Sequence, residues 1–92
     1  MITEGMKKYL YSYRNKVASV FYPPFVKDEH QEIVVAQLKR TVAIDNEAAK
    51  NLRHLELYIV GIFDDVKGDI EPCCNYLIDI DDLLVKEDGN NG

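Results

Sequence analysis

The clearest pattern in the chain is an alternation of side chains between His54 and Asp69. One side of an extended backbone here would carry Leu55, Leu57, Ile59 and Phe63, and the other Glu56, Tyr58, Val60 and Ile62. A period of two, with β-branched and aromatic residues, predicts a strand. Both sides are apolar near Val60 and Ile62, so we expect this half to be buried on both faces, as in a central strand. Turn-forming residues follow, and Gly68 can adopt the positive φ of a tight reversal.

Two further strands are predicted in the first quarter of the chain. Tyrosines alternate with other residues over positions 9–14, which indicates a strand. Asn15 then favours a hairpin turn over residues 14–16. A second apolar strand is expected over residues 17–22, and Pro23 and Pro24 should end its pairing because proline has no N–H to donate.

One amphipathic helix is predicted after these strands. Asp28 is a favourable N-cap, and Gln31 lies three residues further on, as in a capping box. The largely apolar stripe at helical spacing consists of Ile33, Val34, Gln37, Leu38, Thr41 and Val42. Residues 44–51 are expected to form a connector with a short helical turn over residues 47–50.

The last third of the chain completes the predicted sheet. We expect a short strand over residues 69–71 that ends before Pro72, and residues 75–85 fit either an edge strand or a helical turn. The resulting β-β-α-β-β order predicts an α+β fold, with a small mostly antiparallel sheet and one main helix packed on one face. Residues 9–85 would form this single domain, between a flexible N-terminus (1–8) and a disordered tail (86–92).

The composition of the 92 residues limits the classes of function. No run of about 18 apolar residues could span a membrane, and the first residues do not resemble a signal peptide, so we expect a soluble intracellular protein. Cys73 and Cys74 are adjacent and cannot form an unstrained disulfide. His30 and His54 have no zinc-ligand spacing. We predict no metal, no cofactor and no enzymatic activity, because no phosphate loop or nucleophile motif is present.

The charges and the aromatic residues are unevenly distributed. Residues 1–53 contain nine Lys/Arg and six Asp/Glu, whereas residues 54–92 contain two and ten. Six of the nine aromatic residues lie between Tyr9 and Phe25, among basic residues. Such interleaving is typical of single-stranded nucleic-acid binding, in which rings stack on bases and cations contact phosphates. The candidate interface consists of Tyr9, Tyr11, Tyr13, Arg14 and Lys16. A strand with core-facing tyrosines gives the same pattern, and from the residues alone we favour this simpler interpretation.

Three stretches also carry a family resemblance: residues 10–18 (LYSYRNKVA), 22–25 (YPPF) and 56–70 (ELYIVGIFDDVKGDI). Together they resemble the small nonstructural protein of gokushovirus-type microviruses, which are single-stranded DNA phages. The resemblance implies a non-enzymatic protein of the host bacterial cytoplasm that is absent from the virion. It implies a role in viral DNA replication, in the switch toward packaging, or in DNA binding.

Two hypotheses about partners follow. In the first, the protein binds single-stranded DNA or the viral replication and packaging proteins, as a homo-oligomer that gathers the basic strands on one side. In the second, it is an interaction adapter that docks on a protein through its acidic C-terminal half and never contacts DNA. Asp79, Asp81 and Asp82 would then belong to the docking segment, although a solvated face explains them more simply.

Overall fold

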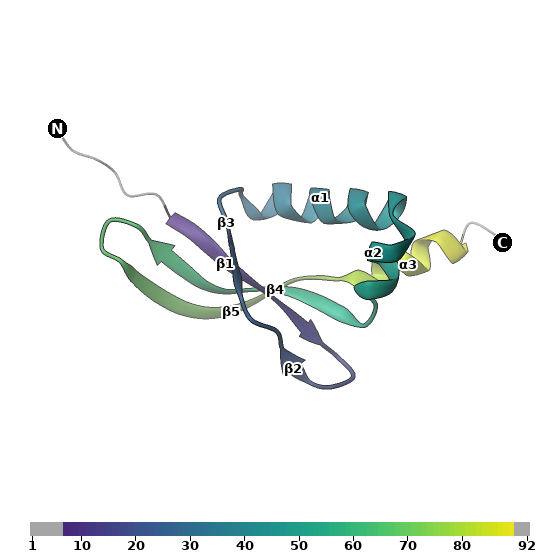
Figure 1. Cartoon of the computed structure of the whole chain (residues 1–92), viewed down its shortest axis with the longest axis horizontal. Helices are drawn as coiled ribbons and strands as arrows, with labels where there is room; N and C mark the ends of the chain where they lie inside the picture. Colours follow the sequence, from purple (N-terminus) through teal and green to yellow (C-terminus); the bar gives the residue numbers. More distant parts are fainter. Residues whose placement is uncertain (1–6, 90–92) are drawn as a thin grey trace.

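The computed structural model describes residues 7–89 and has the predicted α+β fold (Figure 1). In chain order its elements are β1 (Lys7–Asn15), β2 (Val20–Phe21), β3 (Phe25–Lys27), α1 (Gln31–Ile44), α2 (Asn46–Asn51), β4 (Leu55–Asp64), β5 (Asp69–Asp79) and α3 (Ile80–Gly89). Part of the expected flexible N-terminus (1–6) and part of the expected tail (90–92) lie outside the described residues. Within the described part, no helix is long and apolar enough to cross a membrane.

The sheet is antiparallel at every strand pair, in the order β2-β1-β4-β5, with β3 also paired to β1. β4 therefore lies between two neighbours, as its sequence predicts. In the register of β1 and β4, Tyr11 lies opposite Ile59 and Tyr13 lies opposite Leu57. Because paired residues point to the same face, the tyrosine side of β1 continues the apolar side of β4.

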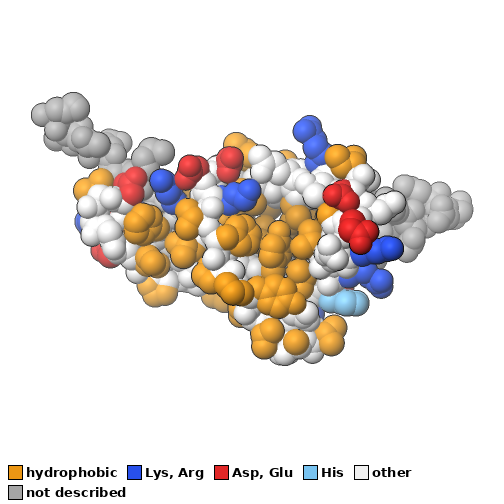
Figure 2. Space-filling view, viewed as in Figure 1, with side chains coloured by type: hydrophobic (Ala, Val, Ile, Leu, Met, Phe, Trp, Pro, Cys, Tyr) orange, Lys and Arg blue, Asp and Glu red, His pale blue; other side chains and the backbone are white. Residues whose placement is uncertain are grey.

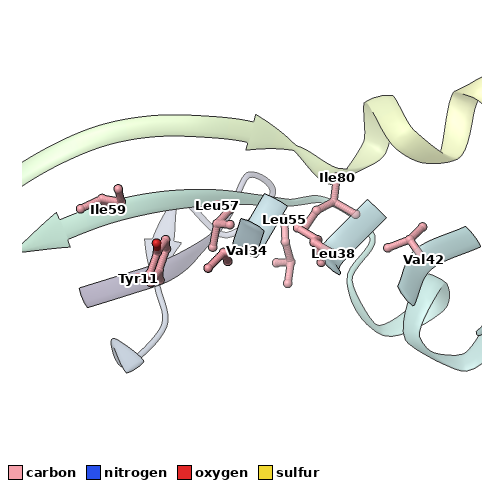
Figure 3. Close-up of a cluster of buried hydrophobic side chains, with 8 residues drawn as sticks. All are labelled: Tyr11, Val34, Leu38, Val42, Leu55, Leu57, Ile59 and Ile80. Carbon is pink, nitrogen blue, oxygen red and sulfur yellow. The ribbon is translucent and has the colours of Figure 1, made fainter. Parts of the chain in front are cut away.

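α1 covers this face of the sheet and closes the core (Figure 3). Its buried residues Val34, Leu38 and Val42 repeat every fourth position, which places them on one side of the helix. The buried cluster consists of Tyr11, Val34, Leu38, Val42, Leu55, Leu57, Ile59 and Ile80. Ile80, the first residue of α3, joins the end of the sheet to the helical layer.

The opposite face of the sheet is open, and this corrects one expectation about β4. Val60 and Ile62 are only half-buried, so the prediction that they are enclosed on both faces is wrong. Val60 also has no partner in the register with β1 or with β5, because the pairing shifts at this position on both sides. Such an irregularity increases the local twist of a strand.

The start of α1 differs from the predicted N-cap. His30, and not Asp28, caps the helix, with its ring Nδ1 accepting a hydrogen bond from the Glu32 N–H at 3.3 Å. Asp28 is instead in an ion pair with Lys8 at 3.6 Å. The short helical turn expected at residues 47–50 is confirmed as α2, whose N-cap is Asp45.

The first hairpin is longer than predicted and resumes after the two prolines. β1 extends to Asn15, whose side-chain oxygen accepts hydrogen bonds from the Val17 and Ala18 N–H groups and so shapes the turn over residues 16–19. Pairing with β1 is interrupted at Pro23 and Pro24, after a last hydrogen bond from the Tyr22 N–H to the Tyr13 carbonyl, and continues in β3. The Ser12 hydroxyl bridges the break by donating to the Tyr22 carbonyl at 2.7 Å. The prediction that the prolines end this pairing is therefore wrong.

β5 also passes through a proline. The strand expected to end before Pro72 continues to Asp79, and α3 follows directly, so both alternatives for residues 75–85 hold in part. Pro72 is tolerated because β5 is an edge strand, where a missing N–H does not interrupt a second ladder. In the β4–β5 turn, Gly68 has the predicted positive φ, at 75°. α3 continues to Gly89, past the expected start of the tail.

Replacing Leu57 with Ala tests whether the core depends on β4. Leu57 is fully buried against the helical layer, so its truncation should lower the free energy of unfolding by roughly 2–5 kcal/mol in urea titrations. Ile44→Ala is the control. Ile44 is largely exposed, so its replacement should lower the free energy of unfolding by less than about 0.5 kcal/mol. Equal losses in the two variants would contradict the described core.

Candidate binding face

The tyrosines of the candidate interface lie on the covered face of the sheet. Tyr11 is fully buried, and Tyr9 and Tyr13 are partly buried against the core. The Phe25 ring stacks on Tyr11 at 5.9 Å between centroids and lies 5.5 Å from Tyr13. The Tyr11 hydroxyl donates to the Glu29 carbonyl at 3.3 Å. The prediction that Tyr11 stacks on a DNA base is therefore wrong, because α1 and β3 occupy its surroundings.

The two cations of the candidate interface are both paired within the chain and lie in different places. Arg14 contacts the Glu56 carboxylate at 3.3 Å on the open face. Lys16 contacts Asp79 at 2.8 Å and Asp81 at 3.0 Å at the end of the sheet. The structure thus separates the five predicted residues. The three tyrosines lie on the covered face, Arg14 lies on the open face, and Lys16 lies at the end of the sheet.

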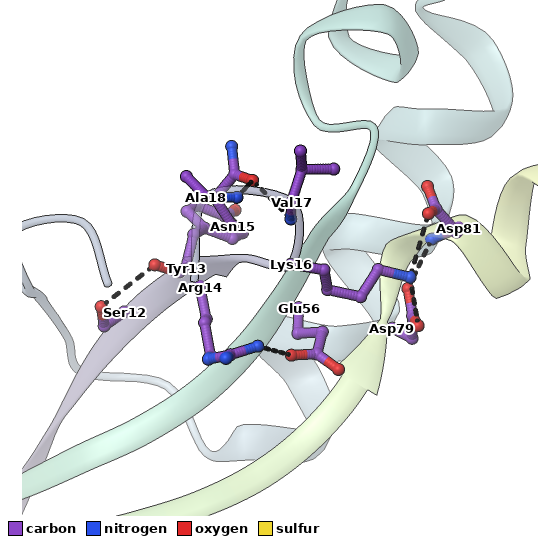
Figure 4. A network of polar contacts seen from close by, with 10 residues as sticks. All are labelled: Ser12, Tyr13, Arg14, Asn15, Lys16, Val17, Ala18, Glu56, Asp79 and Asp81. Atoms are coloured by element: carbon purple, nitrogen blue, oxygen red, sulfur yellow. Dashed lines mark hydrogen bonds and ion pairs between the residues drawn. The ribbon is translucent and has the colours of Figure 1, made fainter. Parts of the chain in front are cut away.

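Lys16 belongs to a polar cluster that we call the Lys16 clamp, consisting of Lys16, His54, Asp79 and Asp81 (Figure 4 shows all but His54). His54 has a left-handed φ of 69°, and its backbone N–H donates to the Asp81 carboxylate at 2.8 Å. The Lys16 N–H donates to the His54 carbonyl at 2.9 Å. The clamp therefore joins three connections: the β1–β2 turn, the α2–β4 loop and the β5–α3 junction.

The open face carries a second set of aromatic residues, which we call the aromatic row: Phe21 of β2, Tyr58 of β4 and Tyr76 of β5. The ring centroids of Phe21 and Tyr58 are 5.1 Å apart, and those of Tyr58 and Tyr76 are 5.8 Å apart, both edge to face. Phe21 and Tyr76 are exposed, and Tyr58 is half-buried between them. A ring from each of three strands thus forms a line across the sheet.

The electrostatic surroundings of the aromatic row combine one guanidinium with several carboxylates. The Arg14 guanidinium lies over the Phe21 ring at 5.9 Å, in a cation–π arrangement, and the Glu56 carboxylate neutralises it. Burial, followed by nearby carboxylates, raises the pKa of Tyr58 and of Tyr76. Both phenols therefore remain uncharged near neutral pH. The row offers flat, neutral rings beside a single guanidinium.

Sequence reasoning missed this row because it depends on long-range pairing. Tyr58 is on the polar side of the predicted central strand, which is the only signal the sequence gives. Its neighbour Tyr76 is opposite it only because the β4–β5 register shifts between Leu57 and Tyr58. Phe21 reaches the row because it pairs with Arg14 across β1.

The adjacent cysteines add no further chemistry to this face. Both thiols are free; Cys73 packs against the core and Cys74 is exposed. The Cys73 thiol lies 3.6 Å from the Ile59 carbonyl, and burial raises its pKa. Within residues 7–89, no three potential metal ligands lie together.

Comparisons with known proteins identify no relative: no family model, curated protein or solved structure matches the chain. The likeness to the phage nonstructural proteins therefore depends on the three stretches quoted above.

The Lys16 clamp should make the stability of the fold sensitive to acid. Burial opposes ionisation of Asp81, but hydrogen bonds from His54 and Lys16 outweigh it and lower the carboxyl pKa below its ordinary value. A lowered native pKa stabilises the fold above the unfolded-state pKa, and this contribution is lost as the pH falls through the native pKa. The unfolding free energy should therefore decrease below about pH 4.

Asp81→Asn should remove part of this acid sensitivity, because it keeps a hydrogen-bond acceptor and loses the charge. Urea titrations from neutral to acid pH should give a flatter profile for this variant than for the unsubstituted chain. Asp82→Asn is the matched control, since Asp82 is an exposed neighbour outside the clamp. Identical profiles for both variants would contradict a stabilising role of the clamp.

Proposed function

We propose that the chain is a non-enzymatic nonstructural protein of a single-stranded DNA phage, and that it binds single-stranded DNA on the open face of its sheet. It would act in the host cytoplasm, in viral DNA replication or in the switch to packaging. The family part of the proposal comes from the resemblance of residues 10–18, 22–25 and 56–70. The assignment of the binding face comes from the geometry of the aromatic row.

The observation that carries the proposal is the line of three rings across three strands, of which Phe21 and Tyr76 are exposed and Tyr58 is half-buried. Single-stranded nucleic acids bind to such platforms because every base has a flat face that can stack on a ring. Phe21, Tyr58 and Tyr76 bring such rings next to one another, in edge-to-face contact, and Arg14 lies beside the first of them. The site of contact is thus moved from the tyrosines of β1 to the opposite face of the same sheet.

The charges around the row predict weak binding that tolerates many sequences. Phosphate contacts normally supply much of the affinity for nucleic acid. Here Arg14 is paired with Glu56, and the whole chain has a net charge of −5. Stacking must therefore supply most of the affinity of one copy.

A protein partner that docks through the acidic C-terminal half is the second candidate. The ion pairs of Arg14 and Lys16 favour it, since they leave little positive charge for phosphates at these positions. Lys16 pairs with Asp79 and Asp81 of the expected docking segment. The exposed acidic residues Asp69 and Glu71 of β5 would therefore contact such a partner instead. In this case single-stranded DNA should not bind even at low salt.

Tyr76→Ala tests the stacking platform directly. Loss of one stacked base costs about 1–3 kcal/mol, so affinity for a fluorescent oligothymidylate should fall by about fivefold to a hundredfold in anisotropy titrations. The control is Ile70→Ala on the same strand, because Ile70 is 54% exposed and Tyr76 is 53% exposed. Ile70 does not belong to the row, so this variant should bind as the unsubstituted chain does. Equal affinities for Tyr76→Ala and Ile70→Ala would refute the proposed platform.

Glu56→Gln tests the contribution of Arg14 with a gain of function. Removing the carboxylate frees the guanidinium for a phosphate, so DNA binding should tighten, and the salt dependence should steepen by about 0.7 for one added contact. Glu47→Gln removes the same charge from exposed α2 and controls for net charge. If both substitutions change affinity equally, Arg14 has no specific role in DNA binding.

A further inference from the structure

The longest uncharged segment of the chain is also one of its most exposed. Residues 17–26 contain no Asp, Glu, Lys or Arg, although 29% of the chain is charged. Every position from 17 to 24 is exposed. The uncharged run at residues 57–63 is different, because β1 and β5 flank it and it is buried or half-buried. Residues 17–26 thus have a composition typical of a buried segment, although most of them are exposed.

We call residues 17–26 the apolar edge, because β2 and β3 form one edge of the sheet. Among the described side chains, ten large hydrophobics are exposed and eight hydrophobics are buried. Half of the exposed ones belong to this segment: Val17, Val20, Phe21, Tyr22 and Val26. Figure 2 shows hydrophobic side chains gathered over the middle and lower part of the viewed face, where Figure 1 places β3 and β2. Exposed patches of this kind mark interaction surfaces.

We infer that the apolar edge is the contact surface of a homodimer in which two copies meet around a two-fold axis. A two-fold interface uses the same patch on both copies, so the patch must be complementary to itself, and an uncharged apolar segment meets this condition. The apolar edge itself contains no Lys or Arg to contact phosphates, and only Phe21 is shared with the aromatic row. The apolar edge would provide the centre of an interface of about 800 Å² per partner.

The backbone of the apolar edge indicates how the two copies meet. Pro23 and Pro24 have no N–H, and the Tyr22 N–H already donates to the Tyr13 carbonyl at 2.8 Å. A continuous strand ladder between the copies is therefore interrupted at its middle. The contact is made by side chains, with Val17, Phe21 and Val26 as its apolar members.

This arrangement goes beyond DNA binding and does not depend on it. Phe21 belongs both to the apolar edge and to the aromatic row. The Phe21 ring packs inward on Tyr58, so edge-to-edge contact would place one aromatic row on each side of the dimer contact. A dimer thus provides two rows where one copy provides one.

The test is the molar mass of the full chain in solution, measured by sedimentation equilibrium over a range of concentrations. We expect a dimer, and we expect Val17→Lys and Val26→Lys to weaken self-association by about tenfold or more, because each places an unpaired charge in an apolar contact. Ile44→Lys is the matched control, since Ile44 of α1 and Val17 are both 76% exposed. This control should dimerise as the unsubstituted chain does.

The outcomes separate the dimer from other occupants of the apolar edge. Unchanged far-UV circular dichroism in all variants would show that the lysines act on association and not on folding, as their exposed positions predict. An unsubstituted chain that remains monomeric at every concentration would overturn the inference. A monomer that instead binds zwitterionic phosphatidylcholine vesicles, and loses this binding in Val17→Lys, would assign the apolar edge to a lipid surface. A dimer that withstands both lysines would place the interface elsewhere.

Discussion

The pleat of β4, held in register with β1, determines which side chains the molecule shows to solvent. Because Tyr11 lies opposite Ile59, one face of the sheet receives the buried residues and α1 covers it. Arg14 and Tyr58 point to the other face, which has no helical layer. A slip of one residue would exchange these faces, and burial of the apolar side prevents it. The position of the open face is therefore a consequence of how the core is packed.

The sequence predicts the parts of the fold that depend on local pattern, which are the α+β class, β4 and the body of α1. It leaves open whether the tyrosines of β1 face a core or a binding surface, although the residues alone favour the core, and this interpretation is confirmed for Tyr11. Errors arise from contacts between distant segments. Asp28 pairs with Lys8 and leaves the cap to His30, and the Ser12 hydroxyl bridges the proline break. Tyr76 joins the aromatic row only through the shifted β4–β5 register.

The basic residues of the first half contribute to the fold as well as to the surface. Arg14 joins β1 to β4 through Glu56, and Lys16 joins the first turn to the β5–α3 junction. Their charges are largely compensated, which leaves flat uncharged rings as the main feature of the open face. In the proposed dimer, Phe21 links this face to the apolar edge, so assembly and DNA binding would use neighbouring parts of one surface.

The central claim is that the open face binds single-stranded DNA and the covered face does not. Nuclear magnetic resonance of the aromatic side chains measures this residue by residue during titration with an oligothymidylate. The account predicts that the ring resonances of Phe21, Tyr58 and Tyr76 shift together, while those of Tyr11 remain in place. Shifts at Tyr11, or none in the aromatic row at saturating DNA, would contradict it.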